Sequence, residues 1–167
     1  MGFECVLVAV DQSMQASIVF NDALELAQRL KAMLVISHCF SESESVPYTD
    51  LYTKPLLNFS YSMQESLRQE IAQGREQVQH YFQQATDSGI PAMIDERFGR
   101  PGLQICKAAH DWDADLIIMG RRGHRRATEN LLGSVSNYVV HHAPHQDPPG
   151  TAGGASAARG GSGARVR

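Results

Sequence analysis

Residues 4–11 read ECVLVAVD, a short and nearly continuous run of apolar residues that ends on an acidic one. A strand with one buried face alternates apolar and polar residues, whereas a strand of a parallel sheet is covered by helices on both faces. The run therefore predicts a central strand of a parallel sheet. MLVISHCF (33–40) and ADLIIMG (114–120) share this pattern, and IPAMIDERF (90–98) shows a less continuous form of it.

Segments with helical periodicity separate the expected strands. Apolar residues recur every three or four positions over 19–30 and 67–85, which is the pattern of amphipathic helices. Further helices are expected over 101–109, where a proline occupies the first turn, and over 134–142. Strands that alternate with helices indicate one α/β domain over residues 1–144, an open Rossmann-like parallel sheet with helices on both faces.

Two segments depart from this alternation. Residues 41–63 contain two prolines and several serines without a sustained period, and they predict an excursion or lid over the domain. Residues 145–167 form a tail rich in glycine, proline, alanine and arginine. Such a composition buries too little apolar surface to offset the entropy of ordering, so we expect the tail to be disordered.

The composition excludes several classes of protein. The chain is 43% hydrophobic and 20% charged, with a formal net charge of −3, so no excess of positive charge points to nucleic acid or to an acidic membrane surface. No apolar run reaches the length of a transmembrane helix, and no signal-peptide pattern precedes the first strand. We expect a cytoplasmic protein. The three cysteines, Cys5, Cys39 and Cys106, are widely spaced in apolar segments, and we expect buried thiols in a reducing compartment.

The stretch MGRRGHRRATENLLGSVS (119–136) follows the last expected strand and contains three glycines. It lacks the spacing of a Walker A loop and of a Gly-x-Gly-x-x-Gly loop. Gly133 and Ser134 nevertheless open a helix, and the free N–H groups at a helix start suit phosphate. The spacing alone leaves two interpretations open, a phosphate-binding turn or a capped helix after a surface loop.

Four segments together resemble the universal stress protein family. They are VAVDQS (8–13), GRPGLQI (99–105), ADLIIMGRRG (114–123) and LLGSVSNYVVHHAP (131–144). The likeness runs from about residue 3 to residue 144, and the spacing Gly-x2-Gly-x9-Gly-Ser matches the pattern of the family's ATP-binding members. The resemblance implies a fold like that of the adenine-nucleotide alpha hydrolases.

The resemblance also implies roles for individual residues. Asp11 would form a hydrogen bond with the ribose or adenine side of a nucleotide, and it could cap the first helix instead of or in addition to this role. The backbone at Cys39 would meet the adenine edge, and the glycine-containing stretch would hold the ribose and phosphates. Gly99 and Pro101 would be structural. The implied binding residues are Val10, Asp11, Cys39, Met119, Gly120, Arg121, Arg122, Gly123, Gly133, Ser134, Val135 and Ser136.

The arginines of this stretch, at positions 121, 122, 125 and 126, have two interpretations. A guanidinium group matches the geometry of phosphate and could clamp a nucleotide. Exposed charges often have no specific partner, so a solvated basic loop is the alternative. Arg121 and Arg122 lie closest to the first glycines and are the better candidates.

The resemblance implies a cytoplasmic protein of stress response or signalling that binds ATP, or AMP or cyclic AMP, with or without Mg²⁺. A slow ATPase or phosphotransferase is an alternative, but the sequence assigns no general base and so no catalytic residue. A second alternative is a nucleotide-free module that binds a protein partner through residues 41–63. Metal ligation by side chains is not expected.

Relatives in the family continue after the last helix with an apolar strand, through which many dimerise. Pro148 and Pro149 stand in its place here, and two prolines cannot join a central ladder. We therefore expect the final edge strand to be missing and a homodimer to be weakened.

Overall fold

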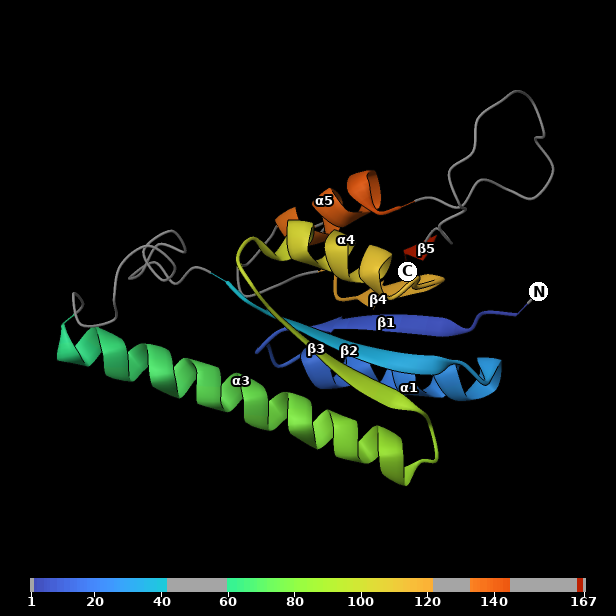
Figure 1. Ribbon diagram of the computed structural model, residues 1–167, viewed down its shortest axis with the longest axis horizontal. Coiled ribbons are helices and arrows are strands. Elements are labelled where there is room, and N and C mark those ends of the chain that lie inside the picture. The colour runs from blue at the N-terminus through green and yellow to red at the C-terminus, as the bar shows by residue number, and fades with distance from the viewer. Residues whose placement is uncertain (1, 42–59, 122–132, 145–164, 167) are drawn as a thin grey trace.

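In the part of the chain that the structure describes, five parallel strands form one sheet in the order β3-β2-β1-β4-β5 (Figure 1). The computed structural model describes residues 2–41, 60–121, 133–144 and 165–166. The strands are β1 (Cys5–Val10), β2 (Met33–Phe40), β3 (Ala92–Phe98), β4 (Leu116–Met119) and β5 (Arg165–Val166). The helices are α1 (Ala16–Leu30), α3 (Tyr61–Asp87), α4 (Pro101–Asp111) and α5 (Ser134–His142).

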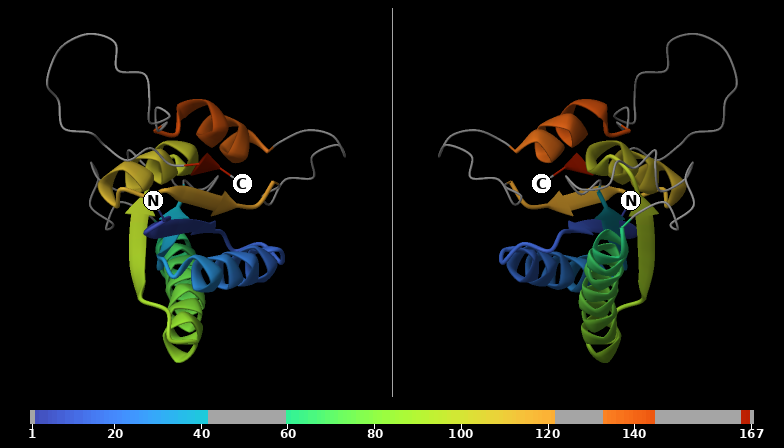
Figure 2. Two further views of the ribbon diagram at one scale, coloured as in Figure 1. Left: turned by 90° about the vertical axis from the view of Figure 1, so that its right-hand side faces the viewer. Right: turned by 90° about the vertical axis from the view of Figure 1, so that its left-hand side faces the viewer.

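The sheet lies between two layers of helices, with α1 and α3 on one face and α4 and α5 on the other (Figure 2). Successive residues of each central strand enter opposite cores, so that Val6 and Val8 pack with Phe20 of α1. Leu7 and Val35 pack on the other face with Ile105 of α4. Burial on both faces explains the continuous apolar runs. The α/β fold class predicted from the sequence is confirmed.

Helix α3 begins earlier than its periodicity predicted. The hydroxyl of Ser60 accepts a hydrogen bond from the Met63 backbone N–H (3.4 Å) and caps the helix start, which adds the first turn to the helix. Residues 61–63 therefore belong to a helix and not to the expected excursion, of which residues 42–59 lie outside the described chain. None of the described helices is long and apolar enough to cross a membrane.

The outer edge of β4 carries a strand, which corrects the expectation that the final edge strand is missing. Leu116 pairs with Arg165 and Ile117 with Val166 in parallel. An unpaired strand edge presents free N–H and C=O groups, and the end of the chain occupies two positions of it. Residues 145–164 and 167 lie outside the described chain, and the expected disorder of the tail stays a prediction.

The turn from β3 into α4 depends on Gly99 and Pro101. Gly99 has a φ of 124°, a conformation that side chains disfavour, and its N–H donates to the Phe40 carbonyl of β2 (3.0 Å). Pro101 occupies the first turn of α4, where its missing N–H has no helical partner to lose. The structural role predicted for both residues is confirmed.

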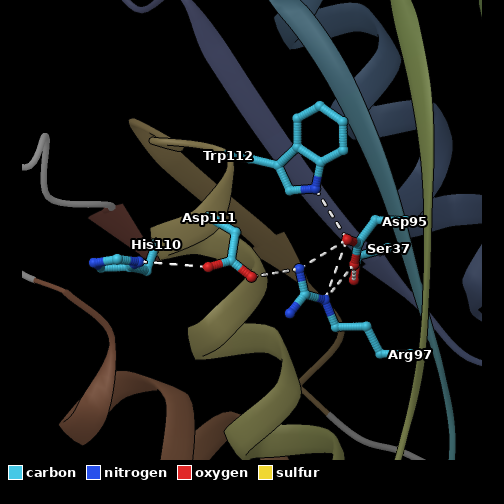
Figure 3. A network of polar contacts seen from close by, with 6 residues as sticks. All are labelled: Ser37, Asp95, Arg97, His110, Asp111 and Trp112. Carbon is cyan, nitrogen blue, oxygen red and sulfur yellow. Dashed lines mark hydrogen bonds and ion pairs between the residues drawn. The ribbon is translucent and has the colours of Figure 1, made fainter.

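A buried carboxylate holds the other end of α4 against the sheet (Figure 3). Asp95 of β3 accepts two hydrogen bonds at 2.9 Å from Arg97, one at 2.9 Å from the Trp112 indole after α4 and one at 3.0 Å from the Ser37 hydroxyl. Arg97 also pairs with Asp111 at 2.9 Å. Burial alone would raise the pKa of Asp95, but hydrogen bonds from Arg97, Trp112 and Ser37 outweigh it and lower that pKa.

We predict that Asp95→Asn lowers the free energy of unfolding by about 2 kcal/mol at pH 7, because it removes the buried charged partner of Arg97 and leaves that side chain only its ion pair with the exposed Asp111. A lowered carboxylate pKa stabilises the folded state above the ordinary value of about 4, and this contribution is lost as the pH falls through the lowered pKa. The difference in the free energy of unfolding between wild type and variant should therefore become smaller below about pH 4. Urea unfolding followed by circular dichroism measures both effects.

The control is Glu25→Gln, which breaks an ion pair with Arg29 whose side chains are 63% and 74% exposed. Such a pair contributes about 0.5 kcal/mol or less. Equal effects of the two substitutions would contradict the role assigned to Asp95.

Candidate functional site

The carboxyl ends of β1 and β4 lie side by side at one edge of the sheet, where Ala9 is opposite Met119. From this point α1 follows β1 on one face of the sheet and α5 lies on the other (Figure 2). Open α/β sheets bind ligands at such a change of direction, beyond the carboxyl ends of the strands. The structure brings Val10 and Asp11, which end β1, to the same edge as Met119 and Gly120.

Asp11 forms a local turn and does not cap α1. Its Oδ1 atom accepts hydrogen bonds from the Ser13 backbone N–H (3.0 Å) and the Ser13 hydroxyl (2.5 Å). The residue that caps α1 is Gln15, which makes no side-chain cap hydrogen bond. The capping alternative is therefore wrong, because four residues separate Asp11 from the helix. Both bonds use one carboxylate oxygen.

The start of α5 is held against the end of β4 by one carbonyl group. The Arg121 carbonyl accepts from the Gly133 N–H (2.8 Å). The Ser136 hydroxyl lies 3.2 Å from the same oxygen and 3.1 Å from the Gly133 carbonyl, so it can donate to either. Ser136 is buried. Its hydroxyl therefore anchors the helix, and only its backbone remains for the phosphate-binding role that the sequence suggested.

The first turn of α5 leaves backbone donors without helical partners. The first helical hydrogen bond runs from the Asn137 N–H to the Gly133 carbonyl (2.9 Å), so the N–H groups of Ser134, Val135 and Ser136 precede the ladder. The helix dipole adds partial positive charge at this end. Ser134 is exposed and Val135 half-buried. The arrangement can bind an anion.

The remaining arginine and glycine candidates cannot all be placed. Arg121 is exposed at the end of β4. Arg122 and Gly123 belong to residues 122–132, which lie outside the described chain together with the arginines at 125 and 126. Their assignment to the site stays a prediction from the sequence.

The cysteines are free thiols, and none has the character of a nucleophile. Burial raises the pKa of Cys5 to about 11 and that of Cys39 to about 12, and it also raises the pKa of Cys106. Cys5 and Cys106 are buried as expected, whereas Cys39 is half-buried at the end of β2. Its sulfur donates to the Gly99 carbonyl (3.5 Å), which places the start of α4 beside the backbone expected to meet the adenine edge.

A pocket of about 280 Å³ opens between the starts of α4 and α5. Its walls are residues 99–103, Ser41 after β2, and three residues of α5, namely Ser134, Val135 and Tyr138. Two residues of the predicted phosphate site, Ser134 and Val135, thus face the first turn of α4 across one cavity. Sequence reasoning treated that turn as structural only and missed its place in the pocket.

The Tyr138 ring forms a fixed wall of the pocket. A Cβ atom at Gly102 would lie 2.7–3.0 Å from the ring and Cβ of Tyr138, so α4 and α5 approach each other closely only because residue 102 is glycine. The ring also stacks on His142, with centroids 4.0 Å apart and planes 8° apart. A glycine directly after a helix-starting proline was the only sequence signal for this contact.

Comparison with known proteins identifies the family. The model of the universal stress protein family matches residues 2–146. A universal stress protein of Synechocystis sp. is 37% identical over 145 residues, which cover 85% of this chain and 94% of that protein. The solved structure of universal stress protein UspA from Lactobacillus plantarum has a TM-score of 0.70 at 27% identity, covering 86% of this chain and 94% of the other.

A third relative is similar in fold alone. The universal stress protein from Archaeoglobus fulgidus, solved in complex with dAMP, has a TM-score of 0.57 at 19% identity, with 86% of this chain and 94% of the other covered. The family match and the relatives together show that this chain belongs to the universal stress protein family.

Proposed function

We propose that this universal stress protein binds an adenine nucleotide at the carboxyl edge of its sheet, with the phosphates at the start of α5. The observation that carries the proposal is the anchoring of Gly133 and Ser136 to the Arg121 carbonyl. This anchoring holds the N–H groups of the first α5 turn, which precede the helical ladder, at the end of β4. A helix start in this setting favours a phosphate group through both its donors and its dipole.

Asp11 supplies the second half of the proposed site. It follows β1, the strand next to β4, and its hydrogen bonds to Ser13 hold the carboxylate in place through one oxygen. The other oxygen can accept a hydrogen bond from a ribose hydroxyl. The dAMP complex of the Archaeoglobus fulgidus protein supports an adenine nucleotide as the ligand, since that nucleotide is bound by a protein of the same fold.

In the cell, the proposed role is that of a cytoplasmic protein that senses or sequesters ATP or a related nucleotide and acts in stress response or signalling. Mg²⁺ would accompany ATP through the phosphate oxygens, which are the ligands this ion prefers. A homodimer is part of the same proposal.

Calorimetry of the folded protein with ATP, AMP and cyclic AMP, each with and without Mg²⁺, tests the proposal. Saturable binding of at least one nucleotide is expected. No heat with any of them at about millimolar ligand, well above the usual range of small-ligand affinities, would refute the proposal.

We predict that Ser134→Asp weakens nucleotide binding by about tenfold or more, because the added carboxylate repels a phosphate at the helix start. The same carboxylate interacts favourably with the helix dipole, so the free energy of unfolding should stay unchanged or rise by about 0.5 kcal/mol. Binding and stability would thus move in different directions. Calorimetry and urea unfolding measure the two quantities.

The matched control is Ser60→Asp, which places the same carboxylate at the start of α3. It should leave nucleotide affinity within about twofold of wild type. If Ser134→Asp bound nucleotide as tightly as this control, the phosphates would not lie at α5.

We predict a thermodynamic coupling between Asp11 and the ribose 2′-hydroxyl. Wild type should bind AMP about fivefold more tightly than dAMP, because a hydrogen bond to a charged acceptor is lost with the hydroxyl. Asp11→Ala should bind the two nucleotides equally well. Calorimetric titration of both nucleotides into both proteins gives the coupling.

Ser13→Ala serves as the control, because it removes the hydroxyl bonded to Asp11 and keeps the carboxylate. It should preserve the discrimination between AMP and dAMP. Discrimination that survives in Asp11→Ala would place the ribose elsewhere.

A further inference from the structure

The pocket between α4 and α5 carries one cation at its wall. Among the described residues that line it, Arg100 is the only charged one, and it is exposed. Arg100 precedes Pro101 as the cap residue of α4, but its side chain makes no cap hydrogen bond. The guanidinium group is therefore not used to hold the helix, and in the described part of the chain no carboxylate forms an ion pair with it.

The pocket walls are set before any ligand arrives. Tyr138 is confined by its contact with Gly102 on one side and by its stack on His142 on the other. The His142 Nδ1 atom also lies 2.8 Å from the Tyr138 carbonyl, within hydrogen-bond distance. A cavity whose walls are fixed in advance loses little conformational entropy on binding. Its volume of about 280 Å³ lies just below the usual range for whole ligands, so it suits one part of a nucleotide.

The electrostatics of the pocket favour the phosphate part. Ser134 and Val135 bring N–H groups of α5 that have no partner within the helix to one wall. On the opposite wall the first helical bond of α4 runs from Gln104 to the Arg100 carbonyl (3.0 Å), so the N–H groups of Gly102 and Leu103 precede the ladder. The starts of two helices, which carry partial positive charge, and the cationic residue Arg100 thus line the same cavity, and a guanidinium group matches the geometry of phosphate.

We infer that Arg100 binds the phosphate chain of the nucleotide in this pocket and makes a triphosphate bind more tightly than a monophosphate. The inference rests on the proposed function. It adds a wall from α4 to a site that the sequence had confined to residues 10–11, Cys39, residues 119–123 and residues 133–136. Arg100 attracts the negative charge of the phosphate chain, and the proposed contact between its side chain and the phosphates is lost when that chain is short.

The experiment measures the affinity of the full chain for ATP, AMP, adenosine and inorganic tripolyphosphate by calorimetry. Arg100→Gln should lower the affinity for ATP and tripolyphosphate by about tenfold and the affinity for AMP by about threefold or less. The affinity for adenosine should not change. Arg100→Glu should enlarge the loss for ATP and tripolyphosphate, because it replaces attraction by repulsion. Circular dichroism should show both variants folded, since the side chain is exposed and caps nothing.

Lys107→Glu is the matched control for net charge. Lys107 is exposed on the same helix, seven residues and about 10 Å from Arg100, and its replacement should change every affinity by about twofold or less. The inference would be overturned if Arg100→Glu changed the ATP-to-AMP affinity ratio no more than Lys107→Glu does. The inference would also be overturned if Arg100→Glu lowered the affinity for adenosine as strongly as the affinity for ATP, since the pocket would then hold the base. Failure of wild type to bind any nucleotide would refute the proposed function itself.

Discussion

The position of the first α5 turn depends on the carbonyl oxygen of Arg121. A carbonyl has two lone pairs, and the Gly133 N–H and the Ser136 hydroxyl both reach this oxygen. The chain therefore leaves the sheet after β4 and returns to the same point to begin α5. Because the contact uses backbone groups and a buried hydroxyl, it is independent of the arginine side chains. The donors at the helix start are placed by the fold and not by a ligand.

Helix α5 is also held in place by its contact with α4 on the opposite side of the pocket. The Asp95 network fastens the C-terminal end of α4 to β3 and β2, and the Gly99 turn fixes its start. Between these two fixed ends, Gly102 meets the Tyr138 ring at a distance that leaves no room for a side chain. The two helix starts that face the pocket are thus held by separate contacts. The start of α5 is held by its contact with β4, and the start of α4 by the contacts at the two ends of that helix.

Burial on both faces explains which parts of the fold the sequence predicted. The strands β1, β2 and β4 lie in continuous apolar runs because helices cover each of their faces. The run of β3 is broken by Asp95 and Arg97, whose partners include Trp112. That pairing depends on the path of α4 back along the sheet, which no local pattern records. For the same reason the α4 wall of the pocket was missed, whereas Gly133 and Ser134 marked the start of α5 in the sequence.

The capping role considered for Asp11 beside its binding role illustrates a related limit. An acidic residue between a strand and a helix fits both a cap and a ligand contact, and the choice depends on the number of residues in the connection. Here the connection is long enough for Asp11 to bond Ser13 and for α1 to begin without a side-chain cap. The carboxylate therefore stays at the end of β1, where a ligand can reach it.

Strand β5, which belongs to the tail, affects the edge of the sheet more than it affects the candidate site. β5 pairs with Leu116 and Ile117, the two residues of β4 farthest from its carboxyl end. Ile118 and Met119, which lead into the site, pair with Val8 and Ala9 of β1. The site end of β4 is thus fixed by the centre of the sheet, and among the described residues no strand pairs with it on the outer side. A change at the C-terminus would alter the pairing at the outer edge of β4, while β1 would continue to hold the end of β4 that leads into the candidate site.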